Sequence, residues 1–284
     1  RRAIRKLKSG NARTELDNGL VIQIEIRLNP DTGSARFDFT GSSAIHAGNF
    51  NTPRSVVQAA ILYVLRTLVD EEIPLNSGCL EPVEIHIPEN CFLNPAHPAA
   101  VVAGNVETSQ ALVDTLYAAL GVLAASQGTM NNFSFGNASV QYYETICGGA
   151  GAGPEFPGAH AVQTHMTNSR LTDPEVLEDR FPVRLEGFHI WRGSGGRGKF
   201  SGGDGVVRRI RFLAPMSASI LSNRRRTAPG GLAGGGDGLT GQNYVERAGG
   251  EKVRLNSCDT IELQAGDVFV IATPGGGAFG PEVK

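Results

Sequence analysis

The sequence lacks the features by which several large classes of protein are recognised. Charge of one sign does not dominate, because 26 Lys and Arg stand against 28 Asp and Glu, and a nucleic-acid-binding protein would need a basic face. No apolar run reaches the ~18 residues of a membrane span, and no signal peptide is visible. We therefore expect neither nucleic acid nor a membrane among the partners.

Cysteine is scarce, and fixed catalytic motifs are missing. The four cysteines are widely spaced and form no Cys-x-x-Cys pair, which predicts reduced thiols in a cytoplasmic protein. There is neither a Gly-x-Ser-x-Gly elbow nor a Walker A loop. No histidine pair has HxH or HExxH spacing, so we expect no metal site built from this chain alone.

Glycine, by contrast, is abundant. The chain has 37 glycines in 284 residues, about 13% against ~7% in average usage, and they follow no period. With 40% hydrophobic residues the chain can form one large domain or two modest ones. The opening residues from Arg1 read like the middle of a helix, which suggests a piece of a longer protein.

The first half shows clear periodicities. Residues 21–28 alternate strictly and predict a half-buried strand; a turn at 29–34 and a strand at 35–40 complete a β-hairpin. Thr52 and Pro53 are typical of a helix start, with Thr as N-cap. The helical stripe that follows consists of Val56, Val57, Ala60, Ile61, Val64, Leu65 and Leu68.

Further elements follow along the chain. Residues 83–87 predict a short strand and residues 109–124 a second helix, with Gly128 as its left-handed terminator. Beyond that glycine, short strands alternate with glycine turns; they are expected at 206–213, 217–221, 260–263 and 268–272. The predicted fold class is α+β, with antiparallel strands and two main helices in residues 1–128. Residues 129–284 form a mostly β part with glycine-rich loops.

Two polar motifs flank the second predicted helix. Residues 104–110 stand at its start, where free N–H groups could bind a small polar ligand through Asn105, Glu107 and Thr108; an ordinary helix cap is the alternative. Residues 126–132 have five polar side chains in seven. They suggest a pocket wall that contains Asn131, or simply the end of the helix.

Three further features lie in the second half. Glu144 precedes the glycine run 148–153, and His165 lies in a polar cluster, so both are candidates for proton transfer. The alternatives are a close-packed loop and a structural histidine. The arginines at 224–226 could bind an anion, but a structural or interface role is favoured.

Many ordered stretches together resemble the hydantoinase B/5-oxoprolinase family. The resemblance covers essentially the whole chain and is therefore far more specific than any single motif. The matching stretches are 39–43, 51–53, 73–79, 93–95, 104–110, 126–132, 142–153, 165–168, 194–196, 202–205, 224–235 and 273–277.

The resemblance implies ATP-dependent ring opening of a cyclic amide, either 5-oxoproline, which would connect it to glutathione metabolism, or a hydantoin. It implies a hydantoinase A-type partner that carries the ATP site, and a divalent metal in the full assembly. The family's B part is about twice this length, so the chain resembles its carboxy-terminal half without the metal-associated amino-terminal half. We expect neither ATP nor metal to be bound by this chain alone.

Two other functions remain open at this point. Relatives in the same family carboxylate ketones, so the chain could belong to a ketone carboxylase alpha-type subunit. It could also be a non-catalytic scaffold that docks the ATP-binding partner through its glycine loops and the arginines at 224–226. An enzyme requires that the candidate polar residues converge, whereas a scaffold would present them on a flat surface.

Overall fold

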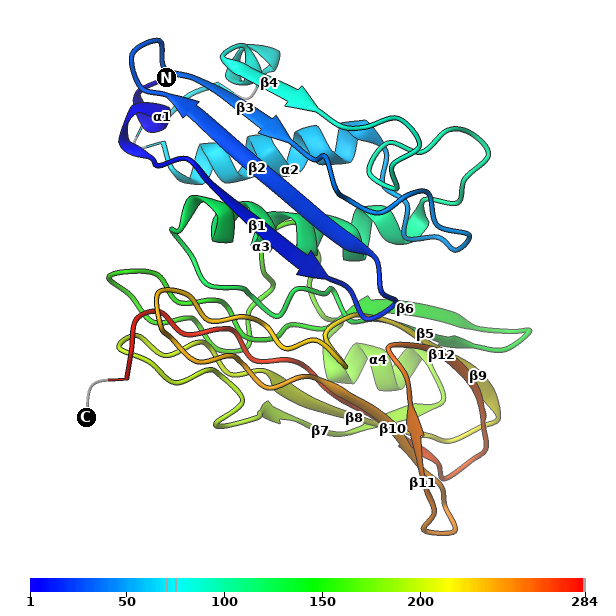
Figure 1. Ribbon diagram of the computed structural model, residues 1–284. Coiled ribbons are helices and arrows are strands. Elements are labelled where there is room, and N and C mark those ends of the chain that lie inside the picture. Colours follow the sequence, from blue (N-terminus) through cyan, green and yellow to red (C-terminus); the bar gives the residue numbers. More distant parts are fainter. Residues whose placement is uncertain (70, 75, 283–284) are drawn as a thin grey trace. The chain divides into compact units, whose positions relative to one another are not determined.

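The computed structural model describes residues 1–284 except 70, 75, 283 and 284. The chain divides into two compact units, Arg1–Leu123 and Ala124–Lys284, drawn in Figure 1. Among the described residues no helix is long and apolar enough to cross a membrane. The four cysteines are free thiols.

The first unit is built on a four-stranded sheet. Its strands run in the order β1 (Gly10–Glu15), β2 (Val21–Asn29), β3 (Ser34–Asp38) and β4 (Val83–His86). The first three are antiparallel, which confirms the predicted hairpin, and β4 joins β3 in parallel. Alternate residues of β2 point into the core and are fully buried.

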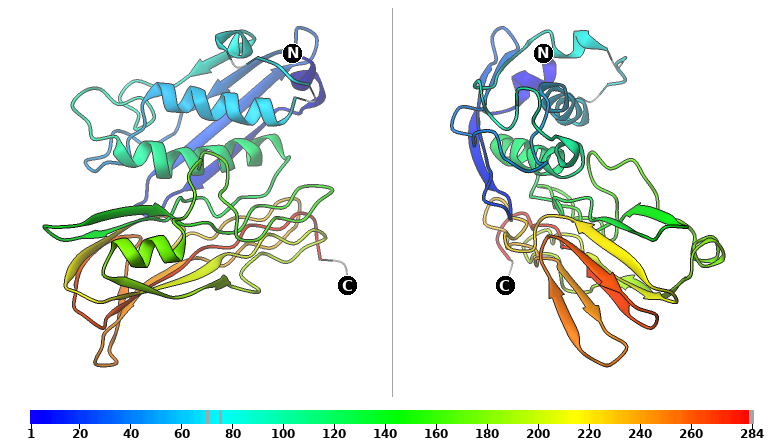
Figure 2. Two further views of the ribbon diagram at one scale, coloured as in Figure 1. Left: turned by 180° about the vertical axis from the view of Figure 1, so that it is seen from behind. Right: turned by 90° about the vertical axis from the view of Figure 1, so that its right-hand side faces the viewer.

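Helices cover one face of this sheet. In Figure 2, α2 (Arg54–Thr67) and α3 (Ser109–Leu120) lie side by side against it. The shorter helical segments are α1 (Arg2–Lys6), η1 (Ser77–Leu80) and the π-helical turn η2 (Gly104–Thr108). The apolar stripe of α2 faces inward as predicted, with Val57, Ala60, Ile61, Val64 and Leu65 buried.

The ends of the two main helices differ from the prediction. Pro53, not Thr52, is the N-cap of α2, because the Thr52 hydroxyl donates to the Phe50 carbonyl (3.3 Å) instead of capping the helix. Helix α3 ends at Gly121, whose φ of 69° supplies the left-handed C-cap. The predicted terminator Gly128 lies beyond the helix, which is therefore shorter than expected.

The second unit contains two antiparallel sheets, as the prediction of a mostly β second half requires. The five-stranded sheet runs β11 (Lys252–Leu255), β10 (Gln242–Glu246), β13 (Val268–Ala272), β8 (Val206–Phe212) and β7 (Val183–Ile190). The four-stranded sheet runs β12 (Cys258–Leu263), β9 (Met216–Leu221), β5 (Asn132–Gly136) and β6 (Gln141–Thr145). The fold class is thus α+β.

An aromatic core lies between the elements of this unit. Phe133 packs on Phe269 at a centroid distance of 4.6 Å, and Phe135 meets Phe212 edge to face at 5.3 Å. Asp173 is the N-cap of helix α4 (Pro174–Arg180), because its carboxylate accepts a hydrogen bond from the backbone N–H of Glu175. Its Leu177 is buried in the same core.

Glycine-rich segments pack backbone against backbone in the second unit. Gly203 N–H donates to Ala150 O, and Gly276 N–H donates to Gly203 O, each at 2.8 Å. A Cβ atom at Gly276 would lie 1.9 Å from Ala150 O, and one at Gly149 would lie 2.0 Å from Gly203 O. Glycine is required here because any side chain would collide with main-chain atoms, so these segments are a packed layer rather than loose loops.

Candidate functional site

Several polar loops meet at one end of the four-stranded sheet. The strand register places Thr145, Asn132, Leu221 and Cys258 in one row across β6, β5, β9 and β12. The polar segment before β5 and the segments after β6 and β9 therefore leave the sheet together. Five polar residues of these loops join one residue of β10 in what we call the amide–arginine cluster: Gln127, Thr129, Asn131, Asn223, Arg225 and Asn243.

Asn131 lies at the centre of this cluster. Its Nδ2 donates to Gln127 Oε1 (2.8 Å) and to Ile146 O (2.9 Å), and its Oδ1 accepts from Arg225 Nη1 (2.7 Å). The side chain is fully buried. The structure thus places one predicted substrate-binding residue in a shared buried network.

The rest of the cluster orders the loop after β9. Arg225 donates from Nη2 to Asn243 Oδ1 (2.8 Å) and from Nη1 to Asn223 O (2.8 Å). The Thr129 hydroxyl accepts the backbone N–H groups of Asn223 and Asn131, both at 3.1 Å. Amide and guanidinium donors held in this way can recognise oxygen atoms of a small polar ligand.

The backbone is strained at four non-glycine positions of the polar loops. They are Asn131 (φ 46°), Ala161 (φ 53°), His165 (φ 48°) and Arg224 (φ 63°), all in the left-handed region, which non-glycine residues rarely occupy. Each such residue costs about 1–3 kcal/mol and persists only where the surroundings impose it. Strain of this kind gathers at functional sites, which favours these loops over the rest of the unit.

Glu144 is engaged in a buried ion pair. Its Oε1 accepts from Arg208 Nε (2.7 Å) and its Oε2 from Arg208 Nη2 (2.9 Å), while Tyr142 OH donates to Oε2 (2.9 Å). The side chains of Glu144 and Arg208 are 1% and 2% exposed. Proton transfer by Glu144 stays a prediction. These contacts show that the Glu144 carboxylate joins β6 to β8 through Arg208.

His165 lies half-buried on the loop that runs beside the end of β6. That loop is anchored by hydrogen bonds to Thr145, whose hydroxyl pairs with Ser169 Oγ and whose carbonyl accepts from Gln163 Nε2 (3.2 Å). The role of His165 in proton transfer also stays a prediction.

The remaining three candidates belong to the first unit. Asn105, Glu107 and Thr108 lie in the π-helical turn η2, which continues directly into α3. The expected free helix N-terminus is therefore wrong, because the turn occupies the N–H groups at that point. Glu107 and Thr108 are fully buried and Asn105 is exposed, and the Thr108 hydroxyl donates to Phe50 O (2.7 Å). A π-turn is frequent at functional sites.

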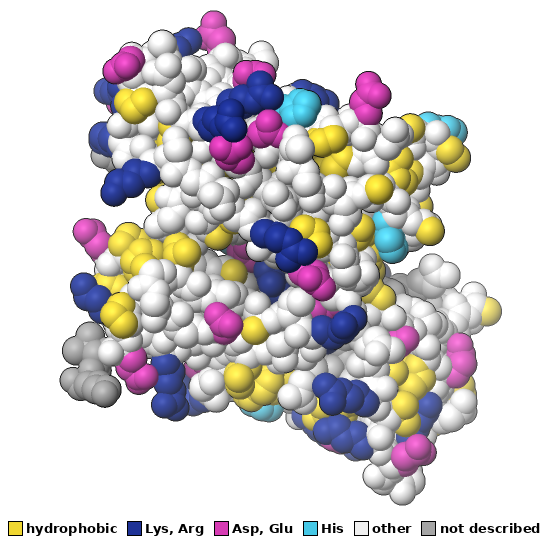
Figure 3. Space-filling view, in the orientation of Figure 1, with side chains coloured by type: hydrophobic (Ala, Val, Ile, Leu, Met, Phe, Trp, Pro, Cys, Tyr) yellow, Lys and Arg dark blue, Asp and Glu magenta, His cyan; other side chains and the backbone are white. Residues whose placement is uncertain are grey.

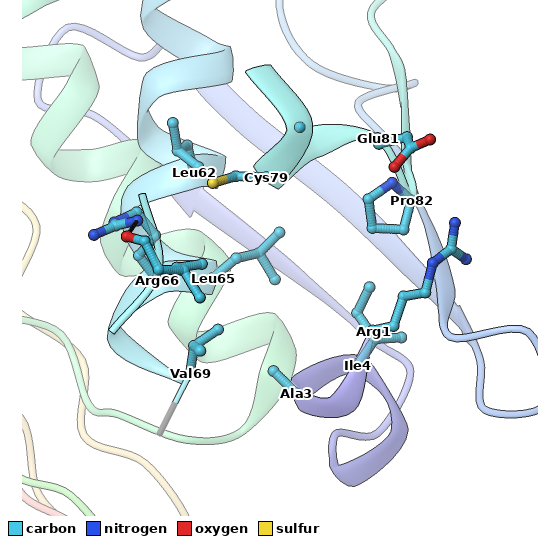
Figure 4. A pocket seen from close by; sticks show the side chains of 12 residues that line it. Arg1, Ala3, Ile4, Leu62, Leu65, Arg66, Val69, Cys79, Glu81 and Pro82 are labelled. Atoms are coloured by element: carbon cyan, nitrogen blue, oxygen red, sulfur yellow. Dashed lines mark hydrogen bonds between the residues drawn. The ribbon is translucent and has the colours of Figure 1, made fainter. Parts of the chain in front are cut away.

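No metal centre coincides with the candidate residues in the part of the chain that the structure describes. In that part of the chain no group of three or more His, Cys, Asp and Glu could hold a metal ion, so the divalent metal implied above does not fit these residues. Figure 4 shows a cavity of about 220 Å³ in the first unit, where Leu62 and Cys79 face each other across from Arg1. None of the six predicted site residues lines it.

Two residues of these networks, Arg208 and Asn243, were not among the residues predicted from the sequence. Arg208 occupies an inward position of β8, between the buried Val206 and Ile210. A charged residue at an inward position of an alternating strand is the sequence feature that could have indicated a buried ion pair. Asn243 lies at an inward position of β10 in the same way. Basic and acidic side chains are interspersed over the molecular face in Figure 3, so surface charge offered no guide.

Comparison with known proteins identifies the family. The family model described as hydantoinase B/oxoprolinase matches residues 1–282. The chain belongs to this family. The 5-oxoprolinase 1 of Arabidopsis thaliana is 49% identical over 268 residues, and the 5-oxoprolinase of Dictyostelium discoideum is 48% identical over 265. These alignments cover 94% and 93% of the chain but 21% of each relative, so the chain spans about a fifth of their length.

Two solved structures share the fold at lower identity. Nucleotide-free acetone carboxylase (TM-score 0.84, 17% identity) matches over 98% of the chain and 46% of its own length. ATP-dependent caprolactamase from Pseudomonas jessenii (TM-score 0.80, 21% identity) matches over 99% of the chain and 54% of its own length. The hydantoinase B/oxoprolinase chain thus adopts a fold found in both enzymes.

Proposed function

We propose that the complete protein containing this chain opens a cyclic amide by ATP-dependent hydrolysis, with 5-oxoproline preferred over a hydantoin. The observation that carries this proposal is the 49% identity to a 5-oxoprolinase along 94% of the chain. The chain would act in the cytoplasm with the amino-terminal half of the B part and a hydantoinase A-type subunit or domain.

The chemistry explains why partners are required. A ring amide is resonance-stabilised, so water adds to its carbonyl carbon only after activation. ATP bound by the A-type partner would supply that activation by phosphoryl transfer. Breaking the C–N bond then needs a proton at the ring nitrogen. We assign the ATP site to the A-type partner and the divalent metal to the amino-terminal half of the B part.

Within this chain, Asn131 of the second unit would orient the substrate, and Asn105, Glu107 and Thr108 of the first unit stay predicted substrate contacts. Between the two proton-transfer candidates we favour His165. Both carboxylate oxygens of Glu144 already accept hydrogen bonds from Arg208 or Tyr142, and histidine is the side chain that most often transfers protons in enzymes. Glu144 would then hold the strand from which the site loops begin.

The test is ring opening coupled to ATP hydrolysis by the complete protein together with its A-type partner. Wild type is compared with His165→Ala and Glu144→Gln, and folding of each variant is checked by thermal unfolding. We expect His165→Ala to reduce kcat at least about a hundredfold with unchanged unfolding temperature, and Glu144→Gln to lower the unfolding temperature. Full turnover by both variants would remove these residues from the mechanism.

The same assay separates the two alternatives. A ketone carboxylase consumes ATP with acetone and bicarbonate but not with 5-oxoproline. A non-catalytic scaffold is indicated if alanine substitutions at Asn105, Asn131 and His165 leave turnover intact but weaken association with the partner. Turnover of 5-oxoproline that depends on His165 is compatible only with the proposed hydrolase.

A further inference from the structure

Gln127 is held in place by a backbone hydrogen bond and by close packing against Gly148. Its backbone N–H donates to Gly149 O (2.8 Å), and its side chain is fully buried. The side chain lies against Gly148, where a Cβ atom would come within 2.0 Å of Gln127 Oε1. The Gln127 carboxamide therefore occupies space that any side chain at position 148 would fill.

The orientation of that carboxamide follows from two neighbours whose roles are unambiguous. A guanidinium can only donate, so the Asn131 atom that faces Arg225 Nη1 is Oδ1. A backbone carbonyl can only accept, so the atom facing Ile146 O is Nδ2. Because Asn131 Nδ2 also points at Gln127 (2.8 Å), the facing atom there is the acceptor Oε1.

The opposite atom, Gln127 Nε2, is then a buried donor that has no hydrogen-bond partner among the described residues. Buried polar groups are nearly always paired, and each exception in a native fold needs an explanation. Asn131 connects this donor to the positive charge of Arg225. A buried N–H group that is linked to a cation through one hydrogen-bonded side chain is complementary to an oxygen atom that gains negative charge during a reaction.

We propose that Gln127 Nε2 binds the carbonyl oxygen of the substrate. The inference rests on the proposed function and deepens it, since it assigns a substrate contact to a residue outside the predicted set. A cyclic amide and a ketone share this carbonyl chemistry. Gln127 would hold the oxygen while the adjacent carbon is attacked.

The experiment measures ligand binding by calorimetry on the complete protein with its A-type partner, using 5-oxoproline, hydantoin and acetone as probes. Gln127→Glu keeps an oxygen toward Asn131 and replaces the donor; Gln127→Met removes both polar atoms. Thr273→Val is the matched control, because it leaves the amide–arginine cluster intact but deprives the backbone N–H of Val206 of its buried hydroxyl acceptor.

We expect both Gln127 variants to weaken binding of the preferred probe about tenfold or more while the unfolding temperature stays within a few degrees of wild type. Thr273→Val should show the reverse, a lowered unfolding temperature with unchanged affinity. Equal affinity in wild type and both Gln127 variants would overturn the proposal and assign Nε2 to a fixed water. Binding of no probe by wild type would also overturn it.

The probes keep this inference separate from the proposed function. Acetone binding that depends on Gln127, with no ring opening of either cyclic amide, would contradict the hydrolase and retain the carbonyl contact. Ring opening of 5-oxoproline with full affinity in Gln127→Met would do the opposite.

Discussion

The two units of the chain hold their backbones in different ways. In the first, aliphatic side chains of β2, α2 and α3 fill the space between sheet and helices, and Ile22, Ile24 and Ile26 are fully buried. In the second, glycine segments contact one another through main-chain atoms, and an ion pair between Glu144 and Arg208 lies inside the core. Neighbouring side chains in the first unit can therefore adjust to a substitution, whereas the main-chain atoms of the glycine segments in the second unit cannot.

The largest expected effect is from a methyl group in the glycine layer. Gly276→Ala would place Cβ 1.9 Å from Ala150 O, and neither backbone can yield as a side chain could. Overpacking costs typically about 1–3 kcal/mol where side chains can adjust, so we expect more than about 3 kcal/mol here. Urea unfolding of the complete protein measures the loss.

The matched control is Gly249→Ala, at an exposed glycine with no atom near its Cβ position. It should change the free energy of unfolding by less than about 1 kcal/mol. Equal stability of the two alanine variants would mean that the glycine layer yields like an ordinary core.

The next largest effect is expected at the buried ion pair between Glu144 and Arg208 in the second unit. Arg208→Met leaves the Glu144 carboxylate buried without its counter-ion, which should cost about 3–5 kcal/mol. The double variant Arg208→Met/Glu144→Leu removes both charges and should recover most of that loss. A double-mutant cycle in urea unfolding checks this, and a double variant as unstable as the single one would show that shape, not charge, dominates.

A core substitution in the first unit sharpens the contrast. Ile24→Val removes one buried methylene from β2, and such changes cost about 0.5–1.5 kcal/mol because neighbouring side chains relax. The free energy of urea unfolding should fall by that amount, well below the loss for Gly276→Ala. A larger loss at Ile24 would remove the proposed difference in rigidity between the units.

The elements that could be predicted from the sequence are those whose patterns are local. The β2–β3 hairpin and the stripe of α2 follow local rules of alternation and periodicity, and the structure bears them out. The π-helical turn at Gly104–Thr108 does not, because its bonding pattern leaves no sequence period. Where the sequence predicts the start of a helix, the structure therefore has a continuous helical segment.

The candidate site shows the same limit. The polar character of residues 126–132 was visible, but the pairing of Asn131 with Arg225 joins residues 94 positions apart. Glu144 and Arg208 are separated by 64 positions. Such partners are set by sheet register and by which glycine segments stack, neither of which a single sequence encodes locally.

The smallest effect concerns the phenol of Tyr142, which lies beside the ion pair. Burial, and secondly the charge of Glu144, raise the pKa of Tyr142 from 10.0 to about 12. Because the folded pKa lies above the unfolded one, the stabilising contribution is complete below pH 10 and is lost as pH rises from 10 to 12. Tyr142→Phe should abolish this part of the alkaline dependence. Ultraviolet titration of the phenolate in wild type and variant measures it, and a phenol in wild type that ionises near pH 10 would show that the polar edge of this core is open to water.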